Sequence, residues 1–478
     1  MYMVRTRFAP SPTGKMHIGN LKSAVVEYLI ARSAGGKFIL RIEDTDQARY
    51  VEGAVAAIYN ALKLAGISHD EGPDIGGDYG PYVQSERRSI YLEYAKKLIE
   101  NGNAYYCFCD KERLAGLKKD GDIDAVKYDR YCLSISKDEI AAKLDSGTPF
   151  VIRQLIPEGR TSFSDEIFGE ITVDNEELDD QILIKSDGLP TYNFANVVDD
   201  HLMKISHVVR GVEYLSSTPK YNLLYAAFGW EPPKYVHVGL LLNENGEKMS
   251  KRKGDASFEE LIERGFLPEA IVNYVALLGW SPATNQEVFS LQELCEVYDI
   301  SRRSKSPSVF DIKKLTWFNS EHIKRMPFEK FFSAALPYLK TVRRENVNFE
   351  NLAKMAQTRV NFISESGGLF DFIDELPDYS PELFFNKKMK TDKEISKKSL
   401  ELVASIIEKI KTWSNAELYS DLCSLAAEAG LKNSQILWPV RTALSGKPAT
   451  PCGASELMEI LGQKETSFRI GKGIEILS

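Results

Sequence analysis

The 478-residue chain has few cysteines and no long apolar run. Its six cysteines are too sparse for the disulfide framework of a small secreted protein. No apolar run approaches the roughly 20 residues that span a bilayer, so we expect no membrane partner. Arg5 and Arg7 lead directly into a loop with Pro and Gly instead of the apolar core of a signal peptide. We therefore expect a cytoplasmic protein.

The chain also lacks an excess of positive charge. It has 60 lysines and arginines against 68 aspartates and glutamates, a formal net charge of −8. This balance argues against a protein that coats nucleic acid through charge alone. It leaves room for an RNA partner bound by a local basic face, because the net charge of a chain does not describe any one surface.

Strands and helices alternate at the beginning of the chain. Residues 3–8 alternate apolar and polar side chains like a strand, and a helical pattern follows as far as Gly35-Gly36. A second strand is expected at 37–42 and helices at 51–65 and 86–101. This order is typical of an α/β fold with a Rossmann-like, doubly wound parallel sheet.

The pattern changes twice further along the chain. Between about 104 and 190, short β-like runs separated by turn residues predict an inserted α/β domain. Its expected strands are 150–155, 170–173 and 181–185. The parallel-sheet pattern is expected to resume at 191–200, 206–210 and 235–242. After about Leu261 helical patterns dominate, so we expect all-α C-terminal domains. The clearest are 268–278, 350–363, 394–413 and 415–429.

Two segments on either side of the insertion carry residues suited to phosphate chemistry. His17 stands at an expected helix start with Gly19 two residues on, where a helix N-terminus favours anions. The alternative is a histidine that only caps its helix. Lys248-Met249-Ser250-Lys251-Arg252 is either a solvated basic loop or a loop whose lysine, best Lys251, neutralises phosphate charge. The two segments together favour activation of a carboxylic acid by ATP, which needs positioning and charge stabilisation.

Five motifs in order extend this interpretation over the chain. They are Arg7–Gly14, Arg41–Asp46, Gln84–Arg87, Thr191–His201 and Lys248–Arg252. Together they resemble bacterial-type glutamyl-tRNA synthetases, a class I family. The resemblance runs from the first strand into the C-terminal helices. It implies ATP with Mg²⁺, L-glutamate and tRNA(Glu) as substrates or partners, and a monomer; it leaves open whether tRNA(Gln) is charged too.

The resemblance also assigns residues to a substrate site. The implied glutamate-binding residues are Arg7, Ala9, Ser11, Glu43, Tyr192, Asn196 and Arg210. The implied ATP-binding residues are His17, Gly19, Asn20, Glu213, Tyr214, Lys248, Ser250, Lys251 and Arg252, with His17 and Lys251 as catalytic residues. Arginine suits a substrate carboxylate because its planar guanidinium binds both oxygens, and Glu43 suits the α-amino group. The alternative for Arg7, Glu43 and Arg210 is ordinary ion pairing at the surface.

A cysteine cluster in the insertion is a candidate metal site. Cys107, Cys109 and Cys132 supply three thiolates, and Tyr128 is the best fourth ligand for a tetrahedral Zn²⁺. Some bacterial glutamyl enzymes are similar here. The alternative is three reduced structural cysteines.

The resemblance gives each part of the chain an expected role. The expected domains are 1–105 and 191–255 as the two halves of a catalytic Rossmann domain, 106–190 as a tRNA acceptor-binding insertion, 256–325 as a stem-contact junction domain and 326–478 as a helical anticodon-binding domain. Trp438–Gly446 resembles the family's signature in the last of these, with Arg359 and Arg441 as candidate RNA contacts.

Four rival functions remain to be weighed against this one. A glutaminyl enzyme normally carries a β-barrel anticodon module, which the helical C-terminal third argues against. A truncated paralogue that modifies a tRNA base ends near the basic loop, and a small nucleotidyltransferase would share the His17 segment alone. A catalytically inactive RNA-binding relative would not be expected to keep His17, Lys251, Arg7 and Glu43.

Overall fold

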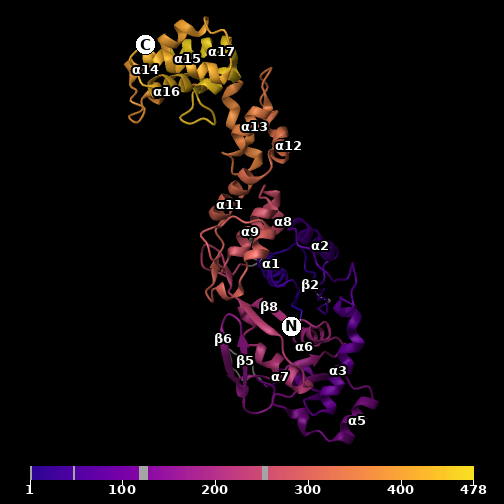
Figure 1. Ribbon diagram of the computed structural model, residues 1–478. Helices are drawn as coiled ribbons and strands as arrows, with labels where there is room; N and C mark the ends of the chain where they lie inside the picture. The colour runs from indigo at the N-terminus through magenta and orange to yellow at the C-terminus, as the bar shows by residue number, and fades with distance from the viewer. Residues whose placement is uncertain (1–2, 47–48, 118–126, 250–256) are drawn as a thin grey trace. The chain divides into compact units, whose positions relative to one another are not determined.

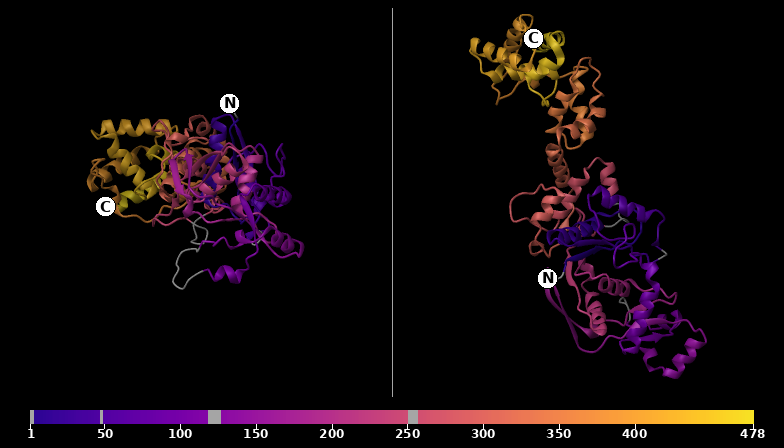
Figure 2. Two further views of the ribbon diagram at one scale, coloured as in Figure 1. Left: turned by 90° about the horizontal axis from the view of Figure 1, so that it is seen from below. Right: turned by 45° about the vertical axis from the view of Figure 1, so that its right-hand side comes forward.

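The computed structural model describes residues 3–46, 49–117, 127–249 and 257–478, and the chain divides into two compact units. The first unit, residues 1–318, holds the strands, and the second, residues 319–478, is helical. Figures 1 and 2 show the strands in the indigo-to-pink part of the chain and helices alone in the orange-to-yellow part. This confirms the expected fold class, a mixed α/β region with parallel strand pairs followed by an all-α region.

Strands β1 (Arg5–Phe8) and β2 (Lys37–Leu40) form a parallel pair joined through helix α1 (Ile18–Ser33). Most of α1 is buried, because it packs on the strands on one side and on α9 (Pro268–Leu277) and α10 (Leu291–Val297) on the other. Gly36 is required at the turn into β2, since a Cβ there would overlap the carbonyl group of Val4. The chain thereby returns from α1 directly beside β1.

A second sheet continues from this pair in the order β6-β5-β9-β8. Its strands are β5 (Arg160–Asp165), β6 (Gly169–Asp174), β8 (His207–Gly211) and β9 (Lys234–Val238). β8 and β9 are parallel, and the amide of Ser206, just before β8, donates to the carbonyl of Arg5 at 2.9 Å. The carboxyl ends of β1 and β8 therefore lie at the same edge, where parallel α/β sheets form their binding sites.

The insertion has an antiparallel sheet of its own. Its strands, in the order β3-β4-β7, are β3 (Ala104–Cys107), β4 (Val151–Gln154) and β7 (Ile182–Ile184). Helices α4 (Lys111–Ala115) and α5 (Lys137–Asp145) lie between β3 and β4 in the chain. Residues of this sheet share one apolar core with helices α3 (Arg88–Glu100), α6 (Tyr192–Leu202) and α7 (Thr218–Phe228).

One expected element is wrong. Residues 191–200, expected to continue the parallel sheet, form helix α6. All seven residues from Phe194 to Asp200 are buried, and Phe194, Val197 and Val198 follow the helical spacing i, i+3, i+4 instead of the alternation of a strand. The expected strands at 206–210 and 235–242 are present as β8, β9 and the short β10 (Leu241–Leu242).

The rest of the first unit connects these layers. Its remaining elements are α2 (Ala54–Leu64), α8 (Phe258–Glu263) and β11 (Ser308–Val309), and α11 (Ile312–Arg325) runs into the second unit. β10 pairs in parallel with β11. This pairing anchors the strand that leads towards Lys248.

The second unit is built from helices alone in its described residues. They are α12 (Phe328–Leu339), α13 (Phe349–Gln357), α14 (Lys393–Ile407), α15 (Asn415–Glu428), α16 (Asn433–Ser445) and α17 (Ala454–Ile476). Helices α14 to α17 pack on one another, and the buried guanidinium of Arg469 bonds the carbonyls of Phe372, Ile373 and Leu444. Of the expected helices here, 350–363 and 394–413 end earlier, at Gln357 and Ile407.

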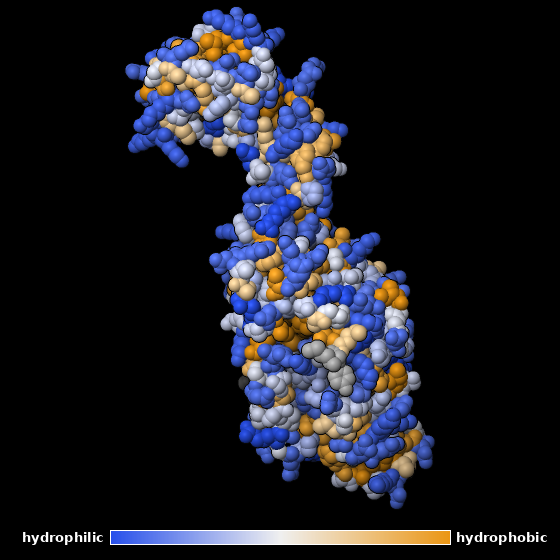
Figure 3. All heavy atoms as spheres, viewed as in Figure 1, coloured by the Kyte–Doolittle hydropathy of each residue, from blue (hydrophilic) through white to orange (hydrophobic). Residues whose placement is uncertain are grey.

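The surface is mostly hydrophilic on the face drawn in Figure 3, and hydrophobic side chains gather there only in separate groups. Among the described residues, no helix is both long and apolar enough to cross a membrane.

Candidate active site

A pocket of about 400 Å³ opens at the edge where β1 and β8 end. It brings together residues that are far apart in the sequence. The predicted residues that line it are Arg7, Ala9, Ser11, His17, Gly19, Asn20, Glu43, Tyr192, Arg210, Glu213, Tyr214 and Lys248. Of the other predicted residues, Asn196 does not line the pocket, and Ser250, Lys251 and Arg252 lie outside the described residues.

His17 is the N-cap of α1. The backbone amide of Gly19 donates to its Nδ1 at 3.0 Å, so in the neutral ring the proton resides on Nε2. The capping hydrogen bond fixes the ring, and Nε2 keeps its N–H as a donor. The two interpretations of His17 are therefore compatible, because capping the helix is what positions the ring at the pocket wall.

Gly19 is suited to this arrangement by its lack of a side chain. A Cβ at this position would lie 3.1 Å from Nδ1 of His17, tighter than an ordinary contact. A side chain would therefore press on the histidine ring.

Arg7 has its guanidinium engaged by the protein itself. Its Nε and Nη2 donate to the two carboxylate oxygens of Asp200, at 2.9 and 3.2 Å. Its Nη1 lies 3.3 Å from Oε1 of Glu27. These bonds exclude simple surface ion pairing, since all three side chains are buried. They also leave Arg7 little donor capacity for a ligand.

Arg210 differs from Arg7 in this respect. It lies near the carboxyl end of β8, with its guanidinium over the ring of Tyr221 at 4.8 Å. Its Nε and Nη1 are buried and have no hydrogen-bond partner in the described structure. Buried donors without partners are costly, so the guanidinium of Arg210 is suited to a ligand that accepts hydrogen bonds.

Glu43 is held by a buried arginine that the motifs include without a role. Nη2 of Arg41 donates to Oε1 of Glu43 at 2.9 Å, and Nη1 donates to Asp200 at 2.8 Å. Burial raises the pKa of Glu43, and Arg41 and Arg7 oppose that shift. The carboxylate is thus fixed beside the pocket, where it can accept from a ligand's ammonium group.

Asn196 stands behind the pocket wall. Its Nδ2 donates to the carbonyl of Tyr192, one helical turn earlier in α6, and its Oδ1 is buried without a partner. The ring of Tyr192 lies 5.6 Å from that of Tyr214. Asn196 therefore supports the start of α6, which carries Tyr192.

Three pocket residues or neighbours had no assigned role in the sequence. They are Lys22 and Glu27 on α1 and Asp200 on α6. Nζ of Lys22 donates to the carbonyl of Gly239 at 2.9 Å, and burial lowers the pKa of Lys22 to about 7. In the sequence, each of the three is a charged residue within a largely apolar helical segment. Such a residue indicates a buried polar interaction but does not tell which ligand, if any, it contacts.

The basic segment is described only as far as Met249. Nζ of Lys248 pairs with Oε1 of Glu213 at 2.7 Å, which links two predicted ATP-site residues across the pocket mouth. Both side chains are largely exposed, so this pair adds little to stability and can exchange for a ligand.

The cysteine cluster converges on Tyr128. Its hydroxyl lies 3.4 Å from Sγ of Cys107 and 3.3 Å from Sγ of Cys109, and the sulfurs of Cys109 and Cys132 are 3.5 Å apart. All three sulfurs lie within 4.8 Å of one another. Ligand atoms about a tetrahedral Zn²⁺, with Zn–S of about 2.3 Å, need roughly this spacing. The three cysteines are therefore spaced as zinc ligands are, with the hydroxyl of Tyr128 beside them.

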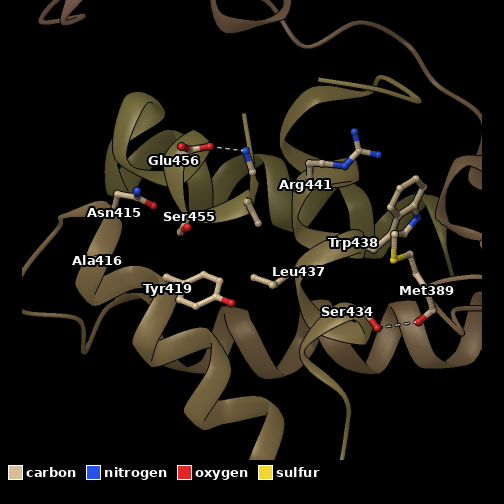
Figure 4. A pocket seen from close by; sticks show the side chains of 12 residues that line it. Met389, Asn415, Ala416, Tyr419, Ser434, Leu437, Trp438, Arg441, Ser455 and Glu456 are labelled. Carbon is tan, nitrogen blue, oxygen red and sulfur yellow. Dashed lines mark hydrogen bonds between the residues drawn. The ribbon is translucent and has the colours of Figure 1, made fainter. Parts of the chain in front are cut away.

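A second pocket, of about 620 Å³, lies among the helices of the second unit. Figure 4 shows Trp438 and Arg441 side by side on α16, with Met389 and Tyr419 on other segments. The guanidinium of Arg441 lies 4.3 Å from the Trp438 ring. A flat ring and a planar cation at a pocket wall are the groups on which an unstacked base can stack.

Comparison with known proteins identifies the class that this fold and site define. Residues 3–317 match the family model of the catalytic domain of class I tRNA synthetases (E and Q), and residues 330–474 match an anticodon binding domain. The chain therefore belongs to the class I tRNA synthetases of the E and Q group.

Three similar proteins carry the name glutamate–tRNA ligase or glutamate tRNA ligase. A glutamate–tRNA ligase from Lachnoclostridium phytofermentans is 56% identical, and the match covers 100% of this chain and 99% of the relative. One from Clostridium botulinum (strain Eklund 17B) is 55% identical and covers 99% of each. The crystal structure of a glutamate tRNA ligase from Elizabethkingia meningosepticum, in complex with its amino acid, superimposes with a TM-score of 0.85 at 35% identity, covering 100% of both chains.

Proposed function

We propose that this chain is a glutamate–tRNA ligase. It uses ATP to convert L-glutamate to glutamyl adenylate and then transfers the glutamyl group to the 3′ end of tRNA(Glu). Relatives of that name, 55–56% identical over nearly the full length, support the activity. The assignment of glutamate as the substrate rests on the buried guanidinium of Arg210. Its Nε and Nη1 have no hydrogen-bond partner in the described structure, and Arg210 lines the same pocket as His17.

Arg210 binds the side-chain carboxylate of glutamate in this proposal. A carboxylate offers acceptors and an opposite charge to the guanidinium, whereas the neutral amide of glutamine would present a donor to a cation. Arg7 adds positive charge from behind, held in place by Asp200. Glu43 accepts from the α-ammonium group. Ala9, Ser11 and Tyr192 shape the wall, with Asn196 supporting Tyr192.

His17 and the basic segment act on ATP. The donor on Nε2 of His17 stabilises charge on the α-phosphate while the glutamate carboxylate attacks and pyrophosphate leaves. Gly19 and Asn20 admit the nucleotide at the start of α1, and Glu213 and Tyr214 contact adenosine. Lys248, Ser250, Lys251 and Arg252 neutralise the leaving phosphates, and Lys251 is the second catalytic residue. Mg²⁺ bound with ATP would add positive charge at the same phosphates.

The remaining parts of the chain serve the tRNA. We assign 106–190 to the acceptor end, 256–325 to the stem and 326–478 to the anticodon, where the Trp438–Arg441 pocket would stack bases. Cys107, Cys109, Tyr128 and Cys132 would hold one structural Zn²⁺ that ties the insertion together. The proposed protein works in the cytoplasm as a monomer.

Glutamate-dependent exchange of pyrophosphate into ATP, measured with and without tRNA(Glu), tests this function. We expect exchange with L-glutamate, and in this family a dependence on tRNA is implied. Absence of exchange under both conditions would refute the proposed enzymatic activity. Exchange with L-glutamine in place of L-glutamate would refute the assignment of the substrate. Charging of tRNA(Gln) can be scored in the same experiment.

Metal analysis of the purified protein tests the zinc site. We expect one zinc per chain, lost in Cys109→Ser, since removing one of four ligands weakens a tetrahedral site. Cys423→Ser, at a cysteine outside the cluster, is the control and should keep the metal. Zinc-free protein with three titratable thiols at 107, 109 and 132 would contradict the assignment.

A further inference from the structure

Glu27 is a buried carboxyl group in the wall of the pocket that no role above employs. It projects from α1, and its side chain is 2% exposed. Its Oε1 lies 3.3 Å from Nη1 of Arg7. Its Oε2 is buried and has no hydrogen-bond partner in the described structure. One oxygen of this group is therefore engaged, loosely, and the other is not.

The distances distinguish Glu27 from the neighbouring Asp200. Asp200 receives short bonds from both Arg7 and Arg41, at 2.9 and 2.8 Å, as expected of an ionised group. Glu27 receives a single bond that is longer than a charge-assisted one. An ionised Glu27 would leave a charged oxygen buried without a donor, which is costly. A protonated Glu27 removes this cost and converts Oε2 into a donor.

The surroundings of Glu27 are consistent with a proton on it. The charged groups that act on it are Arg7 from β1, Arg41 after β2, Asp200 from α6 and Arg210 from β8. Burial raises the pKa of Glu27 well above its usual range, against the opposing effect of Arg7. Helices α9 and α10 also pack on α1, and there burial raises the pKa of Tyr274 to about 12 and raises that of the Cys295 thiol.

The charge balance of the cluster around Arg7 favours a protonated Glu27. Arg7, Arg41, Arg87 and Arg210 carry four positive charges, and Asp199, Asp200 and Glu43 carry three negative ones. A neutral Glu27 leaves the cluster with one unbalanced positive charge, which a single side-chain carboxylate would neutralise. An ionised Glu27 would cancel that charge and repel the same ligand.

We propose that Glu27 keeps its proton at neutral pH and donates a hydrogen bond from Oε2 to the side-chain carboxylate of bound glutamate. Glu27 is then a further substrate-binding residue beside Arg210, and it helps to set the preference for an acidic side chain. This role rests on the proposed function. The direction of the pH dependence follows from this role. Because the protonated form of Glu27 binds, the affinity for glutamate decreases as the pH rises through the pKa of Glu27.

Two substitutions separate the protonated from the ionised form. Glu27→Gln keeps the shape and supplies an uncharged donor, so we expect a KM for glutamate within about twofold of the wild type at neutral pH. Glu27→Ala removes the donor, and we expect KM to increase about tenfold or more with kcat little changed. Glu93→Gln, at an exposed glutamate on α3, is the matched control.

The measurement is tRNA(Glu) charging at varied glutamate, from roughly pH 6 to roughly pH 9, with thermal unfolding to verify that each variant folds. The ratio of wild-type KM to that of Glu27→Gln should stay near one or rise with pH. A ratio that falls with pH, a tenfold change of KM in Glu27→Gln, or an unchanged KM in Glu27→Ala would each overturn the role of Glu27. Absence of glutamate-dependent charging by the wild type would instead refute the proposed function itself.

Discussion

Arg5 and Arg7 lie two residues apart on β1, and each is buried against carboxylates. Arg5 forms a closed cluster: its Nη1 and Nη2 donate to the two oxygens of Glu71 at 2.7 and 3.0 Å, and its Nε donates to the carbonyl of Met203. Glu71 also accepts from the hydroxyl of Tyr82 at 2.6 Å. The donors of the guanidinium and both carboxylate oxygens are engaged within the protein.

The cluster around Arg7 is built from the same residue types but is open. Arg210 keeps two buried donors without partners and Glu27 keeps one oxygen without a partner. Polar groups cost free energy when they are buried and unsatisfied, so an arrangement of this kind is expected where a ligand completes it. The two clusters thus differ not in burial of charge but in the unsatisfied donors and acceptor that the pocket cluster keeps.

Breaking the closed cluster should affect folding and leave binding unchanged. In Arg5→Gln, Glu71 stays buried without its main partner, and we expect a loss of about 3–5 kcal/mol in the free energy of unfolding. Urea denaturation measures this loss. The KM for glutamate of the folded fraction should equal that of the wild type, and a raised KM would show that the two clusters are not independent.

The closed cluster should also make stability depend on acid pH. Burial alone raises the pKa of Glu71, but the bonds from Arg5 and Tyr82 outweigh it and lower the pKa to about 2. Because the folded pKa lies below the unfolded one, this stabilisation is present above about pH 4.5 and is lost as the pH falls towards 2. Glu71→Gln should therefore unfold with a flatter pH dependence in this range. Equal slopes for the variant and the wild type would contradict this.

The smallest expected effect concerns the wall of the open site. In Gly19→Ala the new Cβ would lie 3.1 Å from Nδ1 of His17 and displace the ring by a few tenths of an ångström. We expect kcat to decrease about fivefold, because catalysis depends on position. The stability of α1 should increase slightly, since Ala favours a helix more than Gly. A variant with unchanged kcat would show that the ring adapts.

The sequence predicted the members of the site better than their connections. His17 and Glu43 belong to segments with clear chemistry, Arg210 was assigned by the family resemblance, and all three line one pocket. Glu27 and Asp200 could not be assigned a partner, because their partners lie on other strands and sequence spacing carries no record of which carboxylate faces which arginine. That Arg7 is occupied and Arg210 open is a property of packing.

The same limit applies to the fold. The parallel pair β1–β2 and the helical C-terminal region follow local periodicity and were predicted correctly. Helix α6 was mistaken for a strand, although Phe194, Val197 and Val198 follow the helical spacing i, i+3, i+4. Strand β5 was not expected at all, although it joins the hairpin of the insertion to β9.

The preference for glutamate over glutamine in Arg210→Gln is the sharpest test of the proposed role of Arg210. The measured quantity is the ratio of kcat/KM for the two amino acids in tRNA charging, for the wild type and the variant. If the unpartnered guanidinium of Arg210 binds the substrate carboxylate, the ratio should fall by about a hundredfold or more, with the unfolding temperature nearly unchanged. A ratio equal to that of the wild type would contradict the account.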